Sequence, residues 1–399
     1  MEGVFYYLLH QFVPIEKRIC PNCNSRRIHV HGHFTIRLNV TLQTNFKEVI
    51  QVVMVRFVCL DCHKTFSFEL TGRYGHTSST TVNSFYLKND FKEKLTFSQI
   101  SKKYGVSIPT IINRFDEFYP FVKRGKLTQR ICVDEIYYPL EYTKYVTIIY
   151  DFDSGKIIDL LPGKTIKLLF SYFSAIPLKE RSIVKHFISD LYDGYFAVHN
   201  EFFSQSIHVA DLFHVAELFT NTIDKLRNHS RKQLFGDDTI EGQFMRCRGK
   251  TFLKRLSKGT INRIYRCPIN DQEDTYWNIM TSIFKEDRPL MEMYYDYQDF
   301  LNRKEIITFT NACKYIERWV SKVDIVNYVP EIKTFQNTLI KYKVSIANGL
   351  ATNQKDFRYT NAIAEETNRK IKDLIRISYG FMNADRLRRR LLVLHGFSN

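Results

Sequence analysis

The sequence contains no apolar run that approaches the roughly 18 residues needed to cross a bilayer, which argues against an integral membrane protein. Its first residues lack a basic segment followed by a small-residue cleavage site, so we expect no secretory signal. Low-complexity linkers and internal repeats are also missing. The composition, with 44% apolar and 25% charged residues, is that of a globular protein. With 399 residues, the chain is long enough for roughly two to four domains.

Positive charge is abundant and unevenly distributed. Lys and Arg number 58 against 42 Asp and Glu, which gives a net charge of +16. Residues 131–220 carry 12 acidic and 7 basic side chains, whereas residues 1–130 have a net charge of +10 and residues 221–399 a net charge of +11. Basic surfaces attract phosphate backbones. The pattern predicts either a carboxylate site between surfaces that hold a polyanion, or simply a basic protein.

Four of the eight cysteines are grouped in pairs. Cys20/Cys23 and Cys59/Cys62 present four thiolates at the spacing of a tetrahedral structural zinc site. Alternating residues between the pairs, such as 52–58, favour a small sheet, so we predict a zinc ribbon. Two disulfides or four free thiols are the alternatives, and a cytosolic chain disfavours disulfides. The nearby histidines are expected at the surface or facing DNA: His29, His31, His33 and His63.

Residues 95–118 have the pattern of a helix-turn-helix. Thr96 and Gln99 have capping-box spacing, and Gly105 can adopt the left-handed conformation that ends a helix. Pro109 is well placed near the start of the second helix. Polar side chains occupy the outward face of this second helix: Thr110, Asn113, Arg114 and Glu117. Such a face suits reading of the DNA major groove, and an ordinary helical hairpin is the alternative.

The next segment predicts alternating strands and helices. Strands are expected at 131–136, 145–150, 157–161, 183–189 and 207–211. Helices are expected at about 165–175, at about 194–203 and from near Phe213. Three strands in a meander, then helix, strand, helix, strand and helix, is the element order of a ribonuclease-H-like fold.

Two aspartates stand out in this segment. Asp134 lies in the middle of an apolar strand, where a carboxylate is costly unless it is paired or bound to metal. Asp190 ends the fourth strand, beside the first strand in this topology, and two such carboxylates form a hard-oxygen site suited to Mg²⁺. A structural acid is the alternative for Asp134. We interpret Asp193 as a helix N-cap, and Asp211, just ahead of His214, as a supporting group or further ligand.

A helix expected at 360–376 carries a lone carboxylate, Glu365, on a basic polar stripe. The stripe also contains Asn361, Arg369, Lys372 and Arg376. Either Glu365 completes a metal site while its neighbours hold phosphates, or the stripe is a solvated helix face with i,i+4 pairs. Downstream lies a basic cluster consistent with contact to a nucleic-acid backbone: Arg386, Arg388, Arg389 and Arg390. Between Leu212 and Asn361 we expect a mostly helical, basic insertion.

Together these motifs resemble bacterial insertion-sequence transposases of the DDE type, in particular the ISL-three (ISL3) family, over nearly the whole chain. The resemblance rests on the four paired cysteines and on residues 133–135, 189–192, 209–214, 360–365 and 378–381. It implies that Asp134, Asp190 and Glu365 are the catalytic triad and hold Mg²⁺ or Mn²⁺, with a structural Zn²⁺ in the ribbon. Glu366 stands where the family usually has a small residue, which leaves it open as the alternative to Glu365. Leu212 stands where the family commonly has an arginine, which is a departure that a catalytically decayed transposase could carry.

The resemblance implies a multidomain α/β protein with five segments. These are a zinc ribbon (1–75), a helix-turn-helix DNA-binding domain (76–128), the first part of a ribonuclease-H-like mixed-sheet core (129–225), a helical insertion (226–350) and the core's C-terminal helix with a basic tail (351–399). The implied activity is binding of the terminal inverted repeats of an insertion sequence, with metal-dependent strand cleavage and strand transfer. The residues expected to contact DNA are Thr110, Asn113, Arg114, Arg369, Lys372 and Arg376.

The expected partners are double-stranded DNA, both terminal repeats and target, and a second copy of the chain in a homodimer or larger synaptic assembly. The expected location is the cytoplasm, associated with the nucleoid. One alternative is a catalytically decayed or domesticated transposase that acts as a DNA-binding regulator. Another is a structure-specific nuclease or resolvase with the same core.

Overall fold

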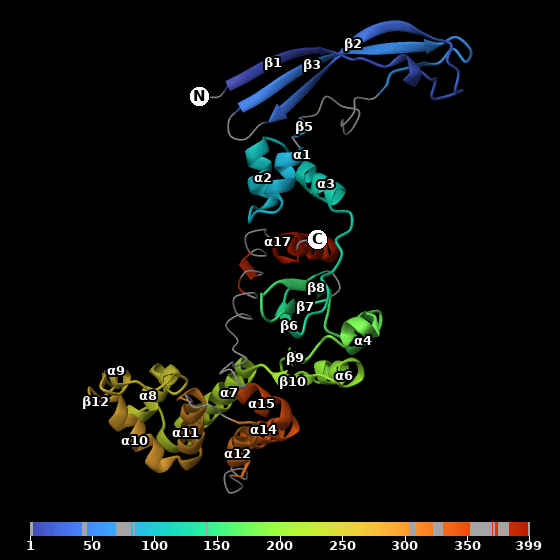
Figure 1. Ribbon diagram of the computed structural model, residues 1–399. Coiled ribbons are helices and arrows are strands. Elements are labelled where there is room, and N and C mark those ends of the chain that lie inside the picture. The colour runs from blue at the N-terminus through green and yellow to red at the C-terminus, as the bar shows by residue number, and fades with distance from the viewer. Residues whose placement is uncertain are drawn as a thin grey trace. The chain divides into compact units, whose positions relative to one another are not determined.

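The chain forms two compact units, Met1–Lys123 together with Lys370–Asn399, and Arg124–Arg369. The computed structural model describes residues 3–41, 46–68, 81–82, 84–140, 143–302, 308–321, 330–351, 369, 372–373 and 383–397. Both units contain strands and helices (Figure 1), so the predicted mixed α/β class is confirmed. In the described part of the chain, no helix is long and apolar enough to cross a membrane.

The first unit begins with a sheet built on a long antiparallel hairpin. The hairpin strands are β2 (Ile28–Thr41) and β3 (Phe46–Cys59). The remaining strands are β1 (Gly3–His10), β4 (Thr65–Phe66) and β5 (Thr81–Val82), and a 3-10 helix, η1 (Ile15–Lys17), follows β1. Because Ile28 pairs with Cys59, the second cysteine pair begins where β3 ends, beside the start of β2. The register thus brings both cysteine pairs to one end of the hairpin.

The described helices of the first unit include the pair expected at residues 95–118. They are α1 (Ser84–Asp90), α2 (Phe97–Tyr104), α3 (Ile108–Phe118) and α17 (Ala384–His395). Thr96 and Gln99 form the predicted capping box, and Gly105 ends α2 with a left-handed φ of 64°. The helices share a buried core of Leu87, Phe91, Ile100, Tyr104, Ile111 and Phe115. The predicted cap, glycine turn and helix pair are therefore confirmed.

The C-terminal arginine cluster is a packing element, which corrects the expectation that it contacts a nucleic-acid backbone. Arg390 is 1% exposed, and its guanidinium donates to the backbone carbonyls of Phe91, Glu93 and Leu95. Arg386 and Arg389 bind the carboxylate of Asp116 on α3, at 2.6 and 3.0 Å. Arg388 donates to a backbone carbonyl after α3. These arginines hold α17 against the helices of the first unit.

The second unit is organised around a five-stranded mixed sheet in the order β10-β9-β6-β7-β8. Its strands are β6 (Arg130–Tyr137), β7 (Tyr145–Asp151), β8 (Ile157–Leu161), β9 (His186–Ser189) and β10 (Ile207–Ala210). The first three form an antiparallel meander, whereas β9 runs parallel to β6 and β10 parallel to β9. All five predicted strands are confirmed. The fourth begins at His186 rather than Ile183, because Ile183 still donates a turn hydrogen bond to Glu180.

Helices connect the later strands of this sheet and follow its last strand. They are α4 (Ile166–Ser174), α5 (Leu178–Arg181), α6 (Asp193–Phe202) and α7 (Leu212–Ser230). Thr165 caps α4, and Asp211 caps α7 by accepting a hydrogen bond from the backbone N–H of Phe213. The three predicted helices are confirmed, and the short α5 is an addition.

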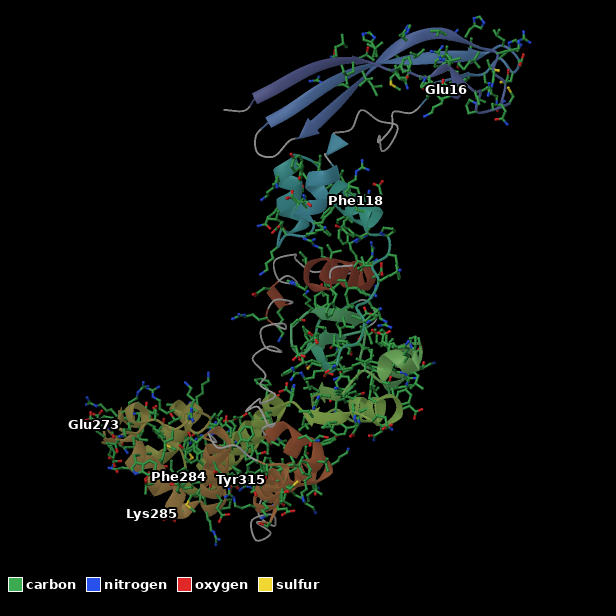
Figure 2. All side chains as sticks on the ribbon, in the orientation of Figure 1. Glu16, Phe118, Glu273, Phe284, Lys285 and Tyr315 are labelled. Carbon is green, nitrogen blue, oxygen red and sulfur yellow. The ribbon has the colours of Figure 1, made fainter. Side chains whose placement is uncertain are left out.

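The remainder of the second unit is mostly helical, as expected of the insertion. Its helices are η2 (Arg231–Phe235), α8 (Ile240–Cys247), η3 (Gly249–Thr251), α9 (Lys258–Ile261), α10 (Tyr276–Glu286), α11 (Arg288–Asn302), α12 (Phe309–Val320), α14 (Pro330–Lys341) and α15 (Lys343–Leu350). A small hairpin, β11 (Ile264–Arg266) and β12 (Glu273–Thr275), interrupts them. Aromatic residues such as Phe219 and Trp319 fill the core. Figure 2 labels Phe284, which is buried, and its exposed neighbour Lys285 on α10.

Candidate active site and metal centre

The pairing of β6 with β9 brings Asp134 and Asp190 to neighbouring positions. Val133 is the parallel partner of Ser189, the last residue of β9, so the residue that follows each partner is one of the two aspartates. Asp134 is 9% exposed inside β6, and Asp190 is partly buried just beyond the end of β9. The structure therefore places these two predicted carboxylates next to each other at the edge of the sheet where β9 ends beside β6.

The charge state of Asp190 reflects this crowding. Burial, followed by the negative charges of Glu135 and Asp134, raises the pKa of Asp190 to about 7, although His214 and a hydrogen bond from the backbone N–H of Tyr192 act in the opposite direction. A carboxyl group in such surroundings favours a proton or a cation. The site thus has the electrostatics of a cation-binding position.

Glu135, the next residue on β6, is held by other side chains. Its carboxylate forms an ion pair with Lys164 at 2.6 Å and accepts a hydrogen bond from the Tyr195 hydroxyl at 3.3 Å. The Lys164 ammonium also lies over the ring of Tyr145, 4.1 Å from its centroid. The sequence analysis did not identify this Glu135–Lys164–Tyr195 group, because Lys164 lies in a loop with no pattern that links it to Glu135.

The other acidic residues of this edge have structural partners. Asp211 caps α7, as its position after β10 allows. The interpretation of Asp193 as an N-cap is wrong: Tyr192 occupies that position, and Asp193 begins α6 and binds the Lys341 ammonium at 2.6 Å. The imidazole Nδ1 of His214 lies 3.4 Å from the carboxylate of Glu217.

A buried histidine joins the sheet to α15 beside this site. His208 Nε2 and Ser189 Oγ are 3.0 Å apart, and His208 Nδ1 and Ser345 Oγ are 2.8 Å apart. Burial, with a smaller effect from His199, lowers the pKa of His208 to about 3. A Cβ added to Gly349 would lie 2.6 Å from the carbonyl oxygen of Ala210, so α15 lies almost in backbone contact with the end of β10.

The third predicted acid, Glu365, and the predicted DNA contact Arg376 lie outside the described residues. Arg369 and Lys372 are described and are exposed. The chain enters this region after Ala351, directly beyond α15. The structure thus brings Asp134 and Asp190 together and locates the point from which the segment carrying Glu365 departs.

The four paired cysteines form a cluster at the end of the first hairpin. Their Sγ atoms all lie within 4.8 Å of one another, and this is the only group of three or more potential ligands that close together among the described residues. The Sγ atoms of Cys20 and Cys62 are 3.6 Å apart and those of Cys23 and Cys59 are 3.5 Å apart. These separations are far longer than the roughly 2.05 Å of a disulfide. They are close to the roughly 3.8 Å expected of thiolates arranged tetrahedrally at about 2.3 Å from an ion. The cluster therefore fits a zinc ribbon.

The two cysteine turns have the same backbone design. Each pair is followed by a residue in the left-handed region, Asn24 with φ of 57° and His63 with φ of 55°. The N–H of each of these residues donates to the carbonyl of the first cysteine, Cys20 or Cys59. Hydrogen bonds from the backbone N–H groups of Cys62 and Asp61 lower the pKa of Cys59 to about 6, which favours the thiolate. His63 and the other three histidines of this region are exposed, as expected.

The outward face of α3 carries the predicted polar residues. Asn113 is exposed, and Thr110 and Arg114 are partly exposed. Thr110 Oγ1 lies 2.8 Å from Oγ of the cap residue Ser107, and Arg114 forms an ion pair with Glu117 at 2.8 Å. The opposite face packs into the core through Ile111 and Phe115.

Known proteins with similar sequences give this geometry its context. Residues 131–391 match the model of a family described as "Transposase", the ISL3 type of DDE transposases. Two curated relatives, the transposases for insertion sequence element IS1557 of Mycobacterium tuberculosis strains CDC 1551 / Oshkosh and ATCC 25618 / H37Rv, are each 25% identical over 268 residues. The alignment covers 65% of this chain and 58% of each relative, so the chain spans little more than half the length of those relatives. Because the family match covers well over half of the sequence, the chain belongs to the ISL3-type family of insertion-sequence transposases.

Proposed function

We propose that this chain is a DNA transposase that binds the terminal inverted repeats of its insertion sequence and catalyses metal-dependent strand cleavage and strand transfer. The observation that carries the proposal is the meeting of Asp134 and Asp190 at one sheet edge inside the family-matched region. The strand order supports a ribonuclease-H-like core, since an antiparallel three-stranded meander is extended by two parallel strands on the side of its first strand.

We assign the ligand roles to Asp134 and Asp190 rather than to Glu135. Both oxygens of Glu135 are engaged, one by Lys164 and the other by Tyr195. Asp134 is nearly buried within an apolar strand, where an ionised carboxylate is costly without a compensating cation. Carboxylate oxygens are the ligands preferred by Mg²⁺ and Mn²⁺. Asp134 and Asp190 would hold such ions, which would supply activation of the attacking oxygen and stabilisation of the leaving 3′-oxygen.

Glu365 is proposed as the third acid, delivered by the segment that follows α15. The close approach of Gly349 to Ala210 fixes the end of α15 beside the strand end that precedes Asp211. This contact supports the proposal because it makes the segment carrying Glu365 depart from the edge of the sheet that holds the aspartates. Glu366 is the neighbouring alternative.

The first unit is proposed to bind the DNA ends. Its cysteine cluster is proposed to hold Zn²⁺, and the polar face of α3, with Thr110, Asn113 and Arg114, is proposed to contact bases or phosphates. Arg369, Lys372 and Arg376 are proposed to contact phosphates near the cut. Because two ends must be joined to one target, we propose a homodimer or larger assembly as the active form.

The test is cleavage of a duplex carrying the inverted repeats that flank the gene, with Mg²⁺ or Mn²⁺. We expect Asp134→Asn to reduce cleavage and strand transfer by roughly 10³-fold or more, because the lost charge cannot be replaced at the metal site. Repeat binding should be unchanged. The matched control is Asp153→Asn, which removes the same charge from an exposed turn after β7.

The outcomes separate the rival functions. Full cleavage by Asp134→Asn excludes this residue from the mechanism. Repeat binding without cleavage by the unaltered chain would identify a DNA-binding regulator, and cutting of branched DNA without preference for the repeats would identify a structure-specific nuclease or resolvase.

A further inference from the structure

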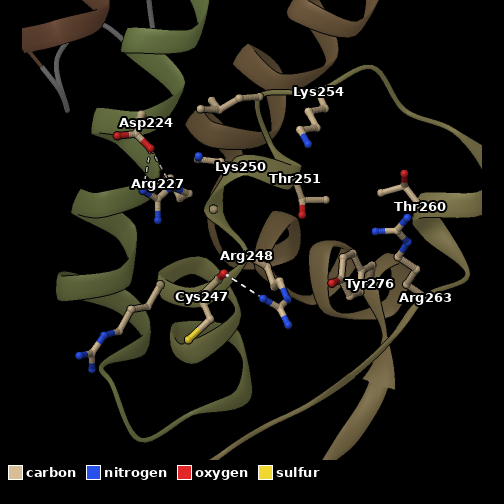
Figure 3. Close-up of a pocket in the computed structure, with 13 residues that line it drawn as sticks. Asp224, Arg227, Cys247, Arg248, Lys250, Thr251, Lys254, Thr260, Arg263 and Tyr276 are labelled. Atoms are coloured by element: carbon tan, nitrogen blue, oxygen red, sulfur yellow. Dashed lines mark hydrogen bonds and ion pairs between the residues drawn. The ribbon is translucent and has the colours of Figure 1, made fainter.

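The helical part of the second unit contains a pocket of about 800 Å³, away from the aspartate site. Residues from α7, α8, η3, α9 and α10 and from the loops between them form its walls. The pocket is lined by Asp224, Arg227, Arg246, Cys247, Arg248, Gly249, Lys250, Thr251, Leu253, Lys254, Thr260, Arg263 and Tyr276 (Figure 3). Six of these side chains are cationic, and Asp224 is the single acid.

The single acid is already neutralised within the pocket. Asp224 forms an ion pair with Arg227 at 2.6 Å. Among the described residues, no ion pair engages the other five cations: Arg246, Arg248, Lys250, Lys254 and Arg263. All five are exposed. Like charges gathered around one hollow repel each other, so the arrangement costs free energy unless an anion enters it.

One cation of the pocket is fixed in place. Arg227 is 8% exposed, and its guanidinium donates to the carbonyl of Met245 as well as to Asp224. The guanidinium rests on the backbone of Gly249, where an added Cβ would lie 2.6 Å from its carbon. In Figure 3, Arg227 lies on one side of the pocket, with Lys254 and Arg263 on the opposite side. The pocket therefore presents positive charge from several directions, and Arg227 is the one cation held in place by its contacts.

We propose that this pocket is a DNA-backbone site that holds phosphodiester groups of bound duplex at a distance from the aspartate edge. The inference rests on the proposed function, in which DNA is the polyanion that the protein binds. An apolar small molecule is a poor fit because few lining residues are apolar, whereas small-molecule sites are mostly apolar. Several exposed cations on one concave surface match the spaced charges of a sugar-phosphate backbone. Neither the cysteine cluster nor α3 contributes to it.

A footprinting experiment on the unaltered chain tests the site directly. The chain is treated with an amine-acetylating reagent with and without a mixed-sequence duplex of about 40 base pairs, because backbone contacts do not depend on sequence. We expect DNA to reduce acetylation of Lys250 and Lys254 at least about threefold. The exposed lysines Lys285 and Lys314, outside the pocket, should react equally in both samples (Figure 2 labels Lys285). Equal acetylation of Lys250 and Lys254 with and without DNA would overturn the proposal.

Matched charge removal gives a second test. The pocket variant replaces Arg246, Arg248 and Arg263 by Gln. The control replaces three exposed lysines outside the pocket by Gln: Lys232, Lys285 and Lys314. Because each neutralised phosphate contributes about −0.9 to the slope of log affinity against log salt, we expect the pocket variant to lose about 2 in slope and roughly tenfold to hundredfold in affinity. The control should change the slope by less than about 0.5.

The results distinguish this inference from the proposed function. A pocket variant that binds DNA like the control overturns the pocket site, even when the unaltered chain cleaves the repeats. Failure of the unaltered chain to bind any duplex overturns both. A last measurement uses inorganic phosphate. Binding of phosphate at about 10 mM that is lost in the pocket variant, together with no protection of Lys250 by DNA, would indicate a small-anion site and overturn the DNA-backbone site.

Discussion

At the scale of single residues, buried polar groups surround the candidate site of the second unit. Two pairs of interactions lie beside Asp134 and Asp190. Glu135 forms an ion pair with Lys164, and His208 lies within hydrogen-bond distance of Ser189 and Ser345. Mid-strand position was the signal that made Asp134 a candidate, because a carboxylate in an apolar strand demands a compensating partner. Lys164 and His208 gave no such signal, since a loop lysine and a histidine in an apolar strand acquire their roles only through their neighbours.

His208 predicts a pH dependence of stability. Its pKa of about 3 in the folded state lies below the ordinary value, so the unfolded chain binds more protons between about pH 3 and 6.5. Stability from this group is complete above about pH 6.5 and is lost as the pH falls, by roughly 3–5 kcal/mol. We expect His208→Gln to flatten the rise in the free energy of unfolding from pH 4 to 6.5, measured by denaturant titration. The exposed His229→Gln is the control, and an unchanged slope in His208→Gln would refute the assignment.

At the scale of elements, α17 packs against the other described helices of the first unit and stabilises them. The sequence analysis expected its arginines, between Arg386 and Arg390, to contact a nucleic-acid backbone. The expectation arose because a surface that binds phosphates also needs several arginines close together. The structure assigns them to backbone carbonyls and to Asp116. Burial opposes ionisation of the Asp116 carboxyl, but hydrogen bonds and charge from Arg386 and Arg389 lower its pKa overall. The local density of positive charge in the sequence therefore indicated that these arginines bind acceptor groups, but it did not indicate which groups.

Arg390 provides the test at this scale. Its guanidinium lies among the rings of Phe91, Phe97 and Phe115, each 5.6–5.9 Å from its carbon, and satisfies three carbonyls. Arg390→Ala leaves a cavity and unsatisfied acceptors, so we expect a loss of roughly 3–5 kcal/mol in the free energy of unfolding of the first unit. Arg390→Lys should recover only part, because lysine lacks the planar fork. The exposed Lys102→Ala is the control, expected within about 0.5 kcal/mol. A loss below about 1 kcal/mol for Arg390→Ala would contradict the packing role.

At the scale of the whole molecule, the division into two compact units predicts that a structural metal stabilises the first unit and not the fold of the second. The first unit contains the cysteine cluster, whereas the second is built on a sheet and a large aromatic core. A thiolate-bound ion contributes folding free energy directly, because the unfolded chain lacks the preformed site. The two units should therefore respond differently to chelation.

Cys23→Ser tests this division. We expect the purified variant to lose about one equivalent of zinc, measured by elemental analysis, and to bind DNA ends more weakly. In calorimetry the transition of the first unit should move to lower temperature while that of the second stays in place. The exposed Ser67→Ala is the control in the same region. Unchanged zinc content in Cys23→Ser would refute the ribbon assignment.

Much of this architecture is determined by the sequence alone. Paired cysteines, the Thr96–Gln99 cap with Gly105, and the apolar strands from residue 131 are local patterns, and each was found where expected. Local patterns predict well because the capping, turn and alternation rules act over a few neighbouring residues.

Tertiary structure alone decided the rest. Four features depend on residues that are distant in the chain. They are the register of β6 on β9, the packing of α15 on β10, the burial of Arg390 and the gathering of cations around one pocket. A side chain's role in each case is set by which far segment folds against it. Neither composition nor the spacing of residues predicts these contacts, because packing and electrostatic interactions between distant segments form only when the chain folds.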